Sequence, residues 1–153
     1  MIIEELSIRD PRVQEFLWKY LEPQDFRHDY TKIDAIKYVE QQCYEGTCRL
    51  FGNMDQEFMF RCTQRNAKVV EPHIMGNGKV LRTAIADGLS VAWRLGYERI
   101  VIWTHHKRIA RIAHRVGFDL HGVIPKVHLV DGEMTDLYAL SIERTKACAT
   151  LLG

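Results

Sequence analysis

Two side chains that can carry a proton stand two residues apart in one strand-like segment, residues 68–75. Glu71 and His73 share a face of a regular strand, because successive side chains alternate between its two faces. Partial burial raises the pKa of a carboxyl group, and imidazole titrates near neutral pH, so either group suits general acid–base chemistry. The alternatives are a surface glutamate at an irregularity caused by Pro72 and a half-buried histidine that bonds to the backbone.

The same segment runs into a glycine-containing turn, Gly76-Asn77-Gly78-Lys79, and then into a long amphipathic stretch. A turn of this kind at a helix N-terminus presents backbone N–H groups that lack intrahelical partners, and these suit a phosphate group. Lys79 and Arg82 add positive charge beside the turn. A lone Gly-x-Gly pattern is weak by itself, and both cations are equally explained as ordinary residues of a helix surface.

Basic residues recur at helical spacing between residues 106 and 116. They are Lys107, Arg108, Arg111 and Arg115. Such a row either contacts a phosphate or an acidic partner, or forms a solvated helix face. The chain has 21 Lys and Arg against 20 Asp and Glu, a formal net charge of +1. This balance argues against nucleic acid as the partner.

Length and composition predict one globular domain over residues 1–153, with 46% hydrophobic and 27% charged residues. The four cysteines form no CxxC pair and have no metal-ligand spacing with histidine, which predicts free thiols, no metal site and a reducing, cytoplasmic setting. A bridge between Cys43 and Cys48 is the alternative under oxidation. The sequence shows no signal-peptide pattern and no apolar run near the roughly 20 residues that span a bilayer.

The segments that must position these side chains alternate between strand and helix patterns. Residues 1–47 predict a first strand over residues 2–8 and then two helices. Asp10-Pro11 is a favourable start for the first helix, and the second runs from Asp34 to Tyr44. The helices therefore precede most of the sheet.

Residues 48–118 predict three strands, the glycine turn, a long helix, a further strand and a further helix. Residues 119–142 predict a closing hairpin, and residues 143–153 a tail. Trp93 and Trp103 are expected in the core. The predicted order is β-α-α-β-β-β-α-β-α-β-β.

This order resembles the GNAT family of acyl-CoA-dependent N-acyltransferases over nearly the whole chain. Three stretches carry the resemblance: a helix that ends in a Gly-Phe pair, a link from the preceding helix into the next strand, and a closing hairpin around Asp131-Gly132. In this sequence they are residues 108–118, residues 96–100 and residues 131–140.

The resemblance implies an α/β fold with a mixed, mostly antiparallel central sheet and helices on both faces. It also implies a V-shaped opening between Glu71–Met75 and Val101–Thr104 that receives the pantetheine arm of acetyl-CoA or CoA. The pyrophosphate would then lie on the turn at Gly76–Val80. The cofactor-binding residues that follow are Ile74, Met75, Gly76, Asn77, Gly78, Lys79, Val80 and Arg82.

Acyl transfer to an amine needs a base, donors for the thioester carbonyl and a proton for the thiolate. Glu71 is the first candidate base, and His73 the second. Two positions differ from the family pattern: Leu81 stands where a small residue opens the helix, and Ala113 where many members have a tyrosine as general acid. The remaining candidates for the proton donor are His105, His106 and Tyr138.

Two functions stay open from the sequence. The first is an N-acyltransferase that transfers an acyl group from acetyl-CoA or another acyl-CoA to an unknown amine. The second is a non-catalytic protein similar to phage GNAT-like proteins, which act in virion or head assembly or in DNA transfer, in the host cytoplasm or the virion. The aromatic and polar loop at residues 24–30 would then dock a protein partner. Neither function needs a membrane, and both allow a homodimer.

Overall fold

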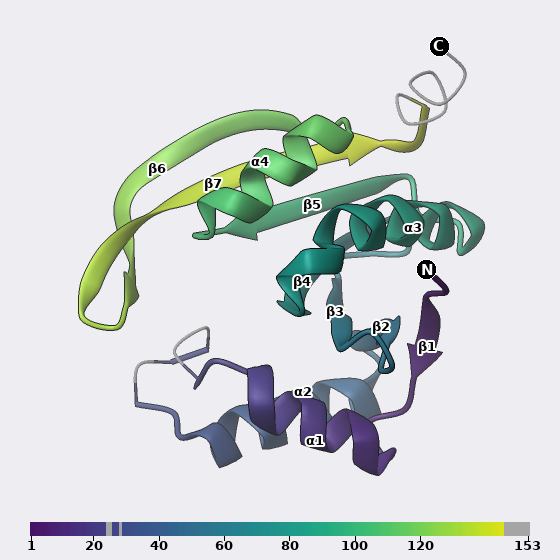
Figure 1. Cartoon of the computed structure of the whole chain (residues 1–153), viewed down its shortest axis with the longest axis vertical. Helices are drawn as coiled ribbons and strands as arrows, with labels where there is room; N and C mark the ends of the chain where they lie inside the picture. The colour runs from purple at the N-terminus through teal and green to yellow at the C-terminus, as the bar shows by residue number, and fades with distance from the viewer. Residues whose placement is uncertain (24–25, 28, 146–153) are drawn as a thin grey trace.

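A computed structural model describes residues 1–23, 26–27 and 29–145. They form a seven-stranded sheet in the order β1-β2-β3-β4-β5-β7-β6, with helices on both faces (Figure 1). Neighbouring strands are antiparallel except for β4 and β5, which are parallel. The predicted α/β class, the mixed, mostly antiparallel sheet and the order of elements are confirmed.

The strands are β1 (Glu4–Leu6), β2 (Cys48–Asn53), β3 (Phe58–Gln64), β4 (Val69–Gly76), β5 (Arg99–Thr104), β6 (Asp119–Val130) and β7 (Glu133–Glu143). The helices are α1 (Pro11–Tyr20), α2 (Lys32–Glu45), α3 (Leu81–Arg94) and α4 (Lys107–Val116), and a 3₁₀ turn, η2 (Gly78–Val80), precedes α3. Among the described helices, none has both the length and the apolar character required to cross a bilayer.

The first two helices begin at side-chain caps. The Asp10 carboxylate accepts the N–H of Arg12 at 2.9 Å at the start of α1. Thr31 and Asp34 form a reciprocal capping box at the start of α2, so this helix begins before the predicted Asp34. Both helices therefore start where local chemistry favours a start.

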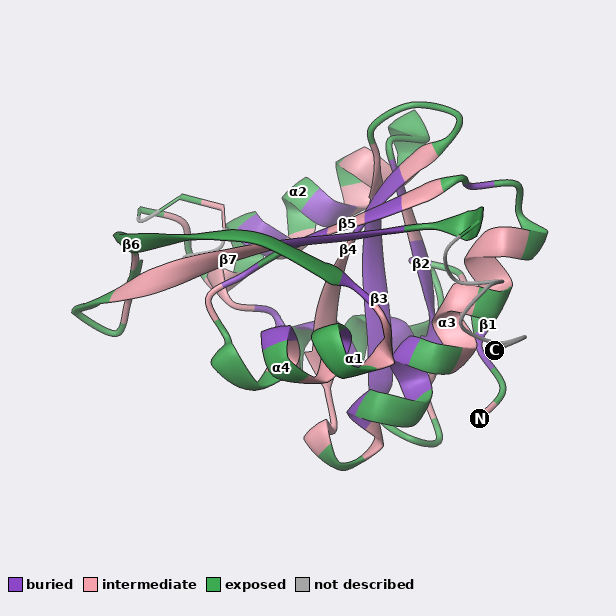
Figure 2. Ribbon diagram, turned by 90° about the horizontal axis from the view of Figure 1, so that it is seen from above, coloured by how far each residue is buried: buried purple, intermediate pink, exposed green. Residues whose placement is uncertain are grey.

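Alternating residues of the strands pack two separate cores. On one face, α3 and α4 cover a core that includes Phe58, Phe60 and Ile102. On the other face, α1 and α2 cover a core that includes Leu50 and Met59. Figure 2 shows that the buried residues concentrate in the middle strands, whereas β6 is exposed along most of its length.

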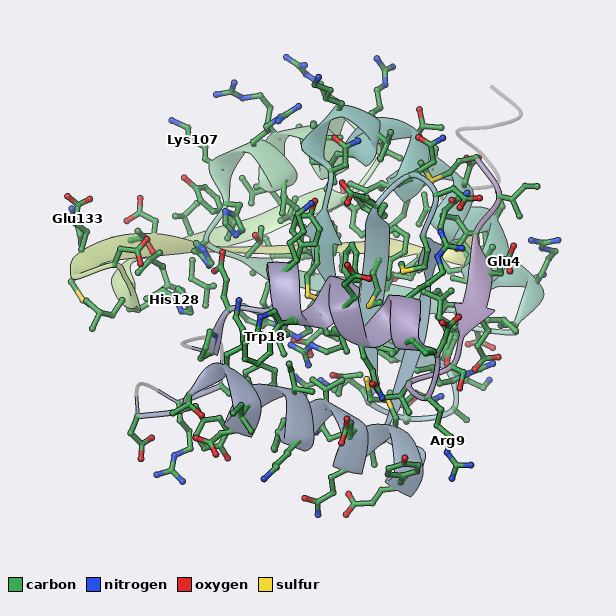
Figure 3. All side chains as sticks on the ribbon, turned by 60° about the horizontal axis from the view of Figure 1, so that its bottom comes forward. Glu4, Arg9, Trp18, Lys107, His128 and Glu133 are labelled. Carbon is green, nitrogen blue, oxygen red and sulfur yellow. The ribbon has the colours of Figure 1, made fainter. Side chains whose placement is uncertain are left out.

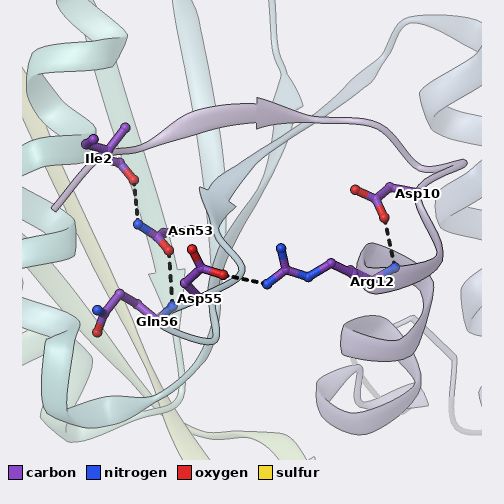
Figure 4. A network of polar contacts seen from close by, with 6 residues as sticks. All are labelled: Ile2, Asp10, Arg12, Asn53, Asp55 and Gln56. Carbon is purple, nitrogen blue, oxygen red and sulfur yellow. Dashed lines mark hydrogen bonds and ion pairs between the residues drawn. The ribbon is translucent and has the colours of Figure 1, made fainter.

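The β2–β3 turn is tied to the N-terminal segment by the polar contacts of Figure 4. Arg12 in α1 reaches Asp55 at 2.7 Å. The side-chain amide of Asn53 donates to the carbonyl oxygen of Ile2 at 3.0 Å and accepts the N–H of Gln56 at 3.1 Å. These contacts join one end of the sheet to the first strand and the first helix.

The β6–β7 hairpin, residues 119–143, is called the outer arm. Its turn is Asp131-Gly132, where both φ angles are positive, 48° and 81°, as a two-residue type I′ hairpin requires. The β6–β7 pairing shifts between Leu120 and Gly122 and again between Ile124 and His128. Figure 3 shows Glu133 near the tip of the outer arm. The predicted hairpin is therefore confirmed, with two irregularities that the sequence pattern did not reveal.

Candidate active site

The sheet opens between β4 and β5. These strands pair only at Val69 with Arg99 and at Val70 with Ile100. Beyond that point β4 stays paired with β3 and β5 stays paired with β7, so the two open edges diverge. Every second residue along each open edge turns its N–H and C=O groups toward the gap. The splay expected between residues 71–75 and 101–104 is present.

A cavity of about 240 Å³, the cleft pocket, lies in this opening. Both halves of the sheet line it, with polar and aromatic side chains that include Arg61, His73, Trp103, His105, His106 and His128. Trp103 is 41% exposed, so the expectation that it lies in the core was wrong. Its side chain faces the cleft pocket instead.

His73 is held as a neutral imidazole. Burial and the nearby guanidinium groups of Arg61 and Arg65 disfavour its cation and lower its pKa to about 3. The Oε1 atom of Glu71 lies 3.7 Å from Nε2 of His73, too far for a hydrogen bond and close enough to attract an imidazolium. Burial is the largest cause of the lowered pKa, the two arginines add to it, and the Glu71 carboxylate is itself paired with Arg65.

Glu71 lies behind His73 and does not line the cleft pocket. It is 5% exposed, and its Oε2 accepts a hydrogen bond from Nε of Arg65 at 2.6 Å, with Nη2 of Arg65 also in contact. Residues 71 and 73 share a face of β4, as predicted, but only His73 reaches the cavity. A buried carboxylate with a bound guanidinium is placed to support a neighbouring group.

His105 and His106 lie where β5 ends and α4 begins. Their rings are 3.8 Å apart, and the His105 ring stacks on His128 at 4.5 Å and 18°. Burial and the two neighbouring imidazoles lower the pKa of His105 to about 4. His106 occupies the N-cap position of α4, yet its side chain makes no capping hydrogen bond there. The His106 side chain therefore does not cap α4.

A second cavity of about 260 Å³, the turn pocket, lies at the glycine turn. Its lining includes Glu22, Met75, Gly76, Gly78, His106 and Arg108. Ile74, Met75 and His106 line both cavities, so the two are neighbours along one opening.

The turn itself is built around Gly76. Its φ is +110°, and an added Cβ would lie 2.1 Å from the carbonyl oxygen of Glu57. The following Asn77 caps the turn: its side-chain oxygen accepts the N–H of Lys79 at 3.0 Å, and its carbonyl oxygen accepts that of Val80 at 3.3 Å. Two N–H groups that were expected to be unpaired thus have partners within the turn.

Arg108 supplies positive charge at the same turn. Its Nη2 donates to the carbonyl oxygen of Gly78 at 2.9 Å, and a Cβ on Gly78 would lie 2.8 Å from Nη1. Lys79 and Arg82 are exposed, and Val80 packs against the core. Lys107, at the start of α4, points away from the sheet (Figure 3).

The implied cofactor residues therefore divide into two groups. Those that line the cavities are Ile74, Met75, Gly76 and Gly78. Those that do not are Asn77, Lys79, Val80 and Arg82. The lining of the two cavities thus combines an apolar strand edge, two glycines and the guanidinium of Arg108.

Leu81, Ala113 and Tyr138, which the family pattern singled out, lie in the core or against it. Leu81 is 4% exposed and Ala113 is fully buried. Leu81 also forms part of the turn-pocket wall. Tyr138 is half-buried against the core and does not line the cleft pocket. Of the candidate proton donors, only His105 and His106 are brought to the cavity.

Arg61 is the main residue of the site that sequence reasoning missed. It is 4% exposed on β3, and its guanidinium lies 4.8 Å from the ring centroid of Phe26. A single charged residue inside the apolar run 58–62 was the available signal, since buried charge in a strand needs a specific environment. Phe26 belongs to the loop proposed for docking, of which residues 24, 25 and 28 lie outside the described part.

Neither protein-family models nor curated protein sequences match this chain. Solved structures do. A spermidine/spermine N-acetyltransferase SpeG from Vibrio cholerae, in mutant form, has a TM-score of 0.75 at 15% identity, covering 97% of this chain and 98% of that one. Spermidine N-acetyltransferase from the same organism, in complex with CoA and spermine, has a TM-score of 0.74 at 12% identity, covering 96% and 97%.

A probable GNAT-family acetyltransferase from Chromobacterium violaceum has a TM-score of 0.66 at 16% identity, covering 94% of this chain and 87% of that one. These similarities extend over nearly the full length at low identity. They show that the chain has the GNAT fold, as its order of elements had indicated.

Proposed function

We propose that this chain is an N-acyltransferase that transfers an acyl group from acetyl-CoA or another acyl-CoA to an amine. The observation that carries the proposal is the splay after Val70 and Ile100, which opens two adjoining cavities beside a glycine turn. The GNAT fold supports it.

The turn pocket is the proposed seat of the CoA thioester. Gly78 lets the Arg108 guanidinium lie directly against the turn, where it offers positive charge to a pyrophosphate. Acyl-CoA would supply an activated carbonyl carbon. The open edge of β4 faces that carbon, so its backbone N–H groups can polarise the carbonyl oxygen.

His73 is the proposed base. It lies in the cleft pocket as a neutral imidazole, so a ring nitrogen is unprotonated when the amine arrives. Its lowered pKa makes it a weak base in the free chain, so proton transfer depends on stabilisation of the imidazolium. Glu71, 3.7 Å away, then stabilises the imidazolium. Glu71 thus becomes a positioning residue behind the base.

His106 is the proposed donor of the second proton. It lines both cavities and so stands where the amine and the sulfur would meet. Ala113 has no ionisable group, and Tyr138 lies on the core side of β7.

The acceptor amine is proposed to carry an aromatic or anionic group. Within the described residues, no carboxylate lines the cleft pocket, whereas Arg61 and Trp103 do. Polycations need acidic partners, and guanidinium and indole groups favour anions and aromatic faces. We therefore expect spermidine to be a poor acceptor here.

The test is calorimetric titration with CoA and acetyl-CoA, followed by turnover with a panel of amines. We expect His73→Gln to lower kcat by about 10²- to 10⁴-fold while CoA affinity stays within a few-fold. His121→Gln, on exposed β6, is the matched control. Unchanged turnover in His73→Gln would remove the base assignment. No CoA binding at millimolar concentration would remove the enzyme proposal.

A non-catalytic assembly protein is the second candidate, and the self-capped turn favours it. Because Asn77 already accepts two N–H groups of the turn, the segment is complete without a ligand. Micromolar CoA binding would exclude this candidate as the main function.

We further propose that the protein associates as a homodimer through the outer arm. Large apolar side chains are exposed along it, including Leu120, Val123, Ile124, Val127, Leu129 and Met134. Contiguous exposed apolar surface is typical of an interface. A spermidine N-acetyltransferase from Vibrio cholerae with the same fold has been solved as a dodecamer.

A further inference from the structure

Three potential metal ligands converge at the mouth of the two cavities. Glu22 follows the end of α1, and His105 and His106 follow the end of β5. Each offers one ligand atom, and the three atoms lie within 4.8 Å of one another. The carboxylate and the imidazoles are 83 or more residues apart in sequence, so a local motif could not predict that they lie close together.

His105 has a polar atom that needs a partner. Its Nε2 is buried and makes no hydrogen bond within the described part of the chain. A buried imidazole nitrogen left in this state costs free energy, so such atoms usually bind something. The ring is also held in place, because it stacks on His128 at 4.5 Å. The ring is therefore fixed in place, and one of its nitrogens has no hydrogen-bond partner in the described part of the chain.

The neighbouring ligands add a second imidazole and a carboxylate. His106 makes no capping bond to α4. Glu22 brings its carboxylate within 4.8 Å of ligand atoms of both histidines, and a dication offsets the cost of holding negative charge in this partly buried place. Burial and charge thus favour a cation at this point.

We propose that Glu22, His105 and His106 form a binding site for a divalent transition metal, with Zn²⁺ as the best match. Two imidazoles and one carboxylate are a common Zn²⁺ ligand set, and a fourth position is left for water or a bound molecule. Metal–ligand bonds of about 2.0–2.2 Å place ligand atoms about 3.5 Å apart in a tetrahedron. Small side-chain rotations close the remaining distance.

The position of the site gives the metal a mechanical role. Glu22 belongs to the segment that follows α1, and the two histidines belong to the corner between β5 and α4. A shared ion ties these parts together across the opening and stiffens one wall of both cavities. Metal binding therefore raises stability, because only the folded chain assembles the three ligands.

Cysteine thiols are the competing Zn²⁺ ligands that the experiment must separate. Cys43 on α2 and Cys48 on β2 are free cysteines whose thiols influence each other's pKa. Thiolate ligation gives Co²⁺ an intense charge-transfer absorption, whereas nitrogen and oxygen ligands give only visible ligand-field bands. Co²⁺ is thus the probe that identifies the ligand type.

The test uses the full chain, free of any affinity tag and treated with a chelator. Calorimetry with Zn²⁺ should give one ion per chain, and Co²⁺ should show visible bands without the thiolate absorption. We expect Glu22→Gln and His105→Gln each to weaken Zn²⁺ binding by about 100-fold or more. They should also abolish the Zn²⁺-dependent rise in Tm, whereas His121→Gln should leave both effects intact.

Three results would overturn the proposal: no stoichiometric Zn²⁺ binding below about 100 μM, thiolate absorption with Co²⁺, or equal affinity in the parent and both variants. Glu22→Gln keeps the size and polarity of the side chain, so it remains informative if His105→Gln folds poorly. The proton-donor role of His106 applies to the metal-free chain, because a bound metal would occupy one of its ring nitrogens. CoA binding and turnover are therefore measured before Zn²⁺ is added, and failure of one proposal is distinguishable from failure of the other.

Discussion

The two halves of the sheet that part at the cleft are covered very differently. On β2 and β3, α3 packs one face, and α1 and α2 pack the other. On β5, β7 and β6, α4 packs one face, and the outer arm extends past it with most side chains exposed (Figure 2). The candidate site lies at the boundary, with His73 from one half and His105 and His106 from the other. A half covered on both faces and a half covered mainly on one face thus meet at the cavity.

The largest expected effect tests the covered half. Phe58 is 1% exposed and contacts Phe60 edge-on at 5.0 Å. We expect Phe58→Ala to lower the free energy of unfolding by about 3–5 kcal/mol, because it leaves a cavity between strands and helix. Leu129→Ala, at a position that is 52% exposed on the outer arm, should change it by less than about 0.5 kcal/mol. Denaturant titration measures both, and similar losses would contradict the comparison.

The second-largest expected effect on stability concerns Gly76, which ends β4 at the boundary between the two halves of the sheet. Gly76→Ala forces a side chain into a left-handed conformation against the carbonyl oxygen of Glu57. We expect a loss of about 1–3 kcal/mol in unfolding free energy, together with weaker CoA binding. Gly122→Ala on the outer arm is the matched control, since its added Cβ meets nothing within 4 Å. A neutral result at Gly76 would show that the turn rearranges freely.

A pH dependence follows from the buried edge of the cleft. The pKa of His73 is lowered from 6.5 to about 3, so the unfolded chain binds more protons between these values. The stability contributed by this group is complete above about pH 6.5 and falls as the pH drops toward 3, by at most about 1.4 kcal/mol per pH unit.

Urea titrations between pH 7 and pH 4 measure this slope. We expect it to flatten in His73→Gln, because the replacement does not titrate. An unchanged slope would assign the pH dependence to other groups.

The smallest effect on stability tests the open half. Ile124 is 44% exposed on β6. We expect Ile124→Lys to change the stability of the single chain by less than about 0.5 kcal/mol while it disrupts self-association. Sedimentation velocity measures the association. A parent protein that is monomeric at high micromolar concentration would refute the homodimer.

Local patterns predicted most of the fold. Asp131-Gly132 allowed one hairpin type, and the glycine turn after residues 68–75 marked the end of β4. Element order was therefore readable from turns and periodicity. The length of β1 was not, because strand ends depend on the partner strand: only residues 4–6 pair with β2.

The candidate site was predicted less completely, because its geometry depends on distant segments. The shared face of Glu71 and His73 followed from the strand period, but the pairing of Glu71 with Arg65 decides which one reaches the cavity. The capping role of Asn77 and the approach of Glu22 to His105 depend on how separate segments pack. Neither contact could be predicted from the spacing of residues along the chain.

The bulge in β6 has a consequence for how this protein stays in solution. A long apolar strand at the edge of a sheet is a template on which further copies can stack into fibrils. Pro125 supplies no N–H for such stacking, and Lys126 adopts a φ of +54° with its own N–H bonded to Asp136. The ladder with β7 is interrupted at the same place. The outer arm can therefore expose apolar side chains while its interrupted backbone disfavours the addition of further strands in an amyloid-like sheet.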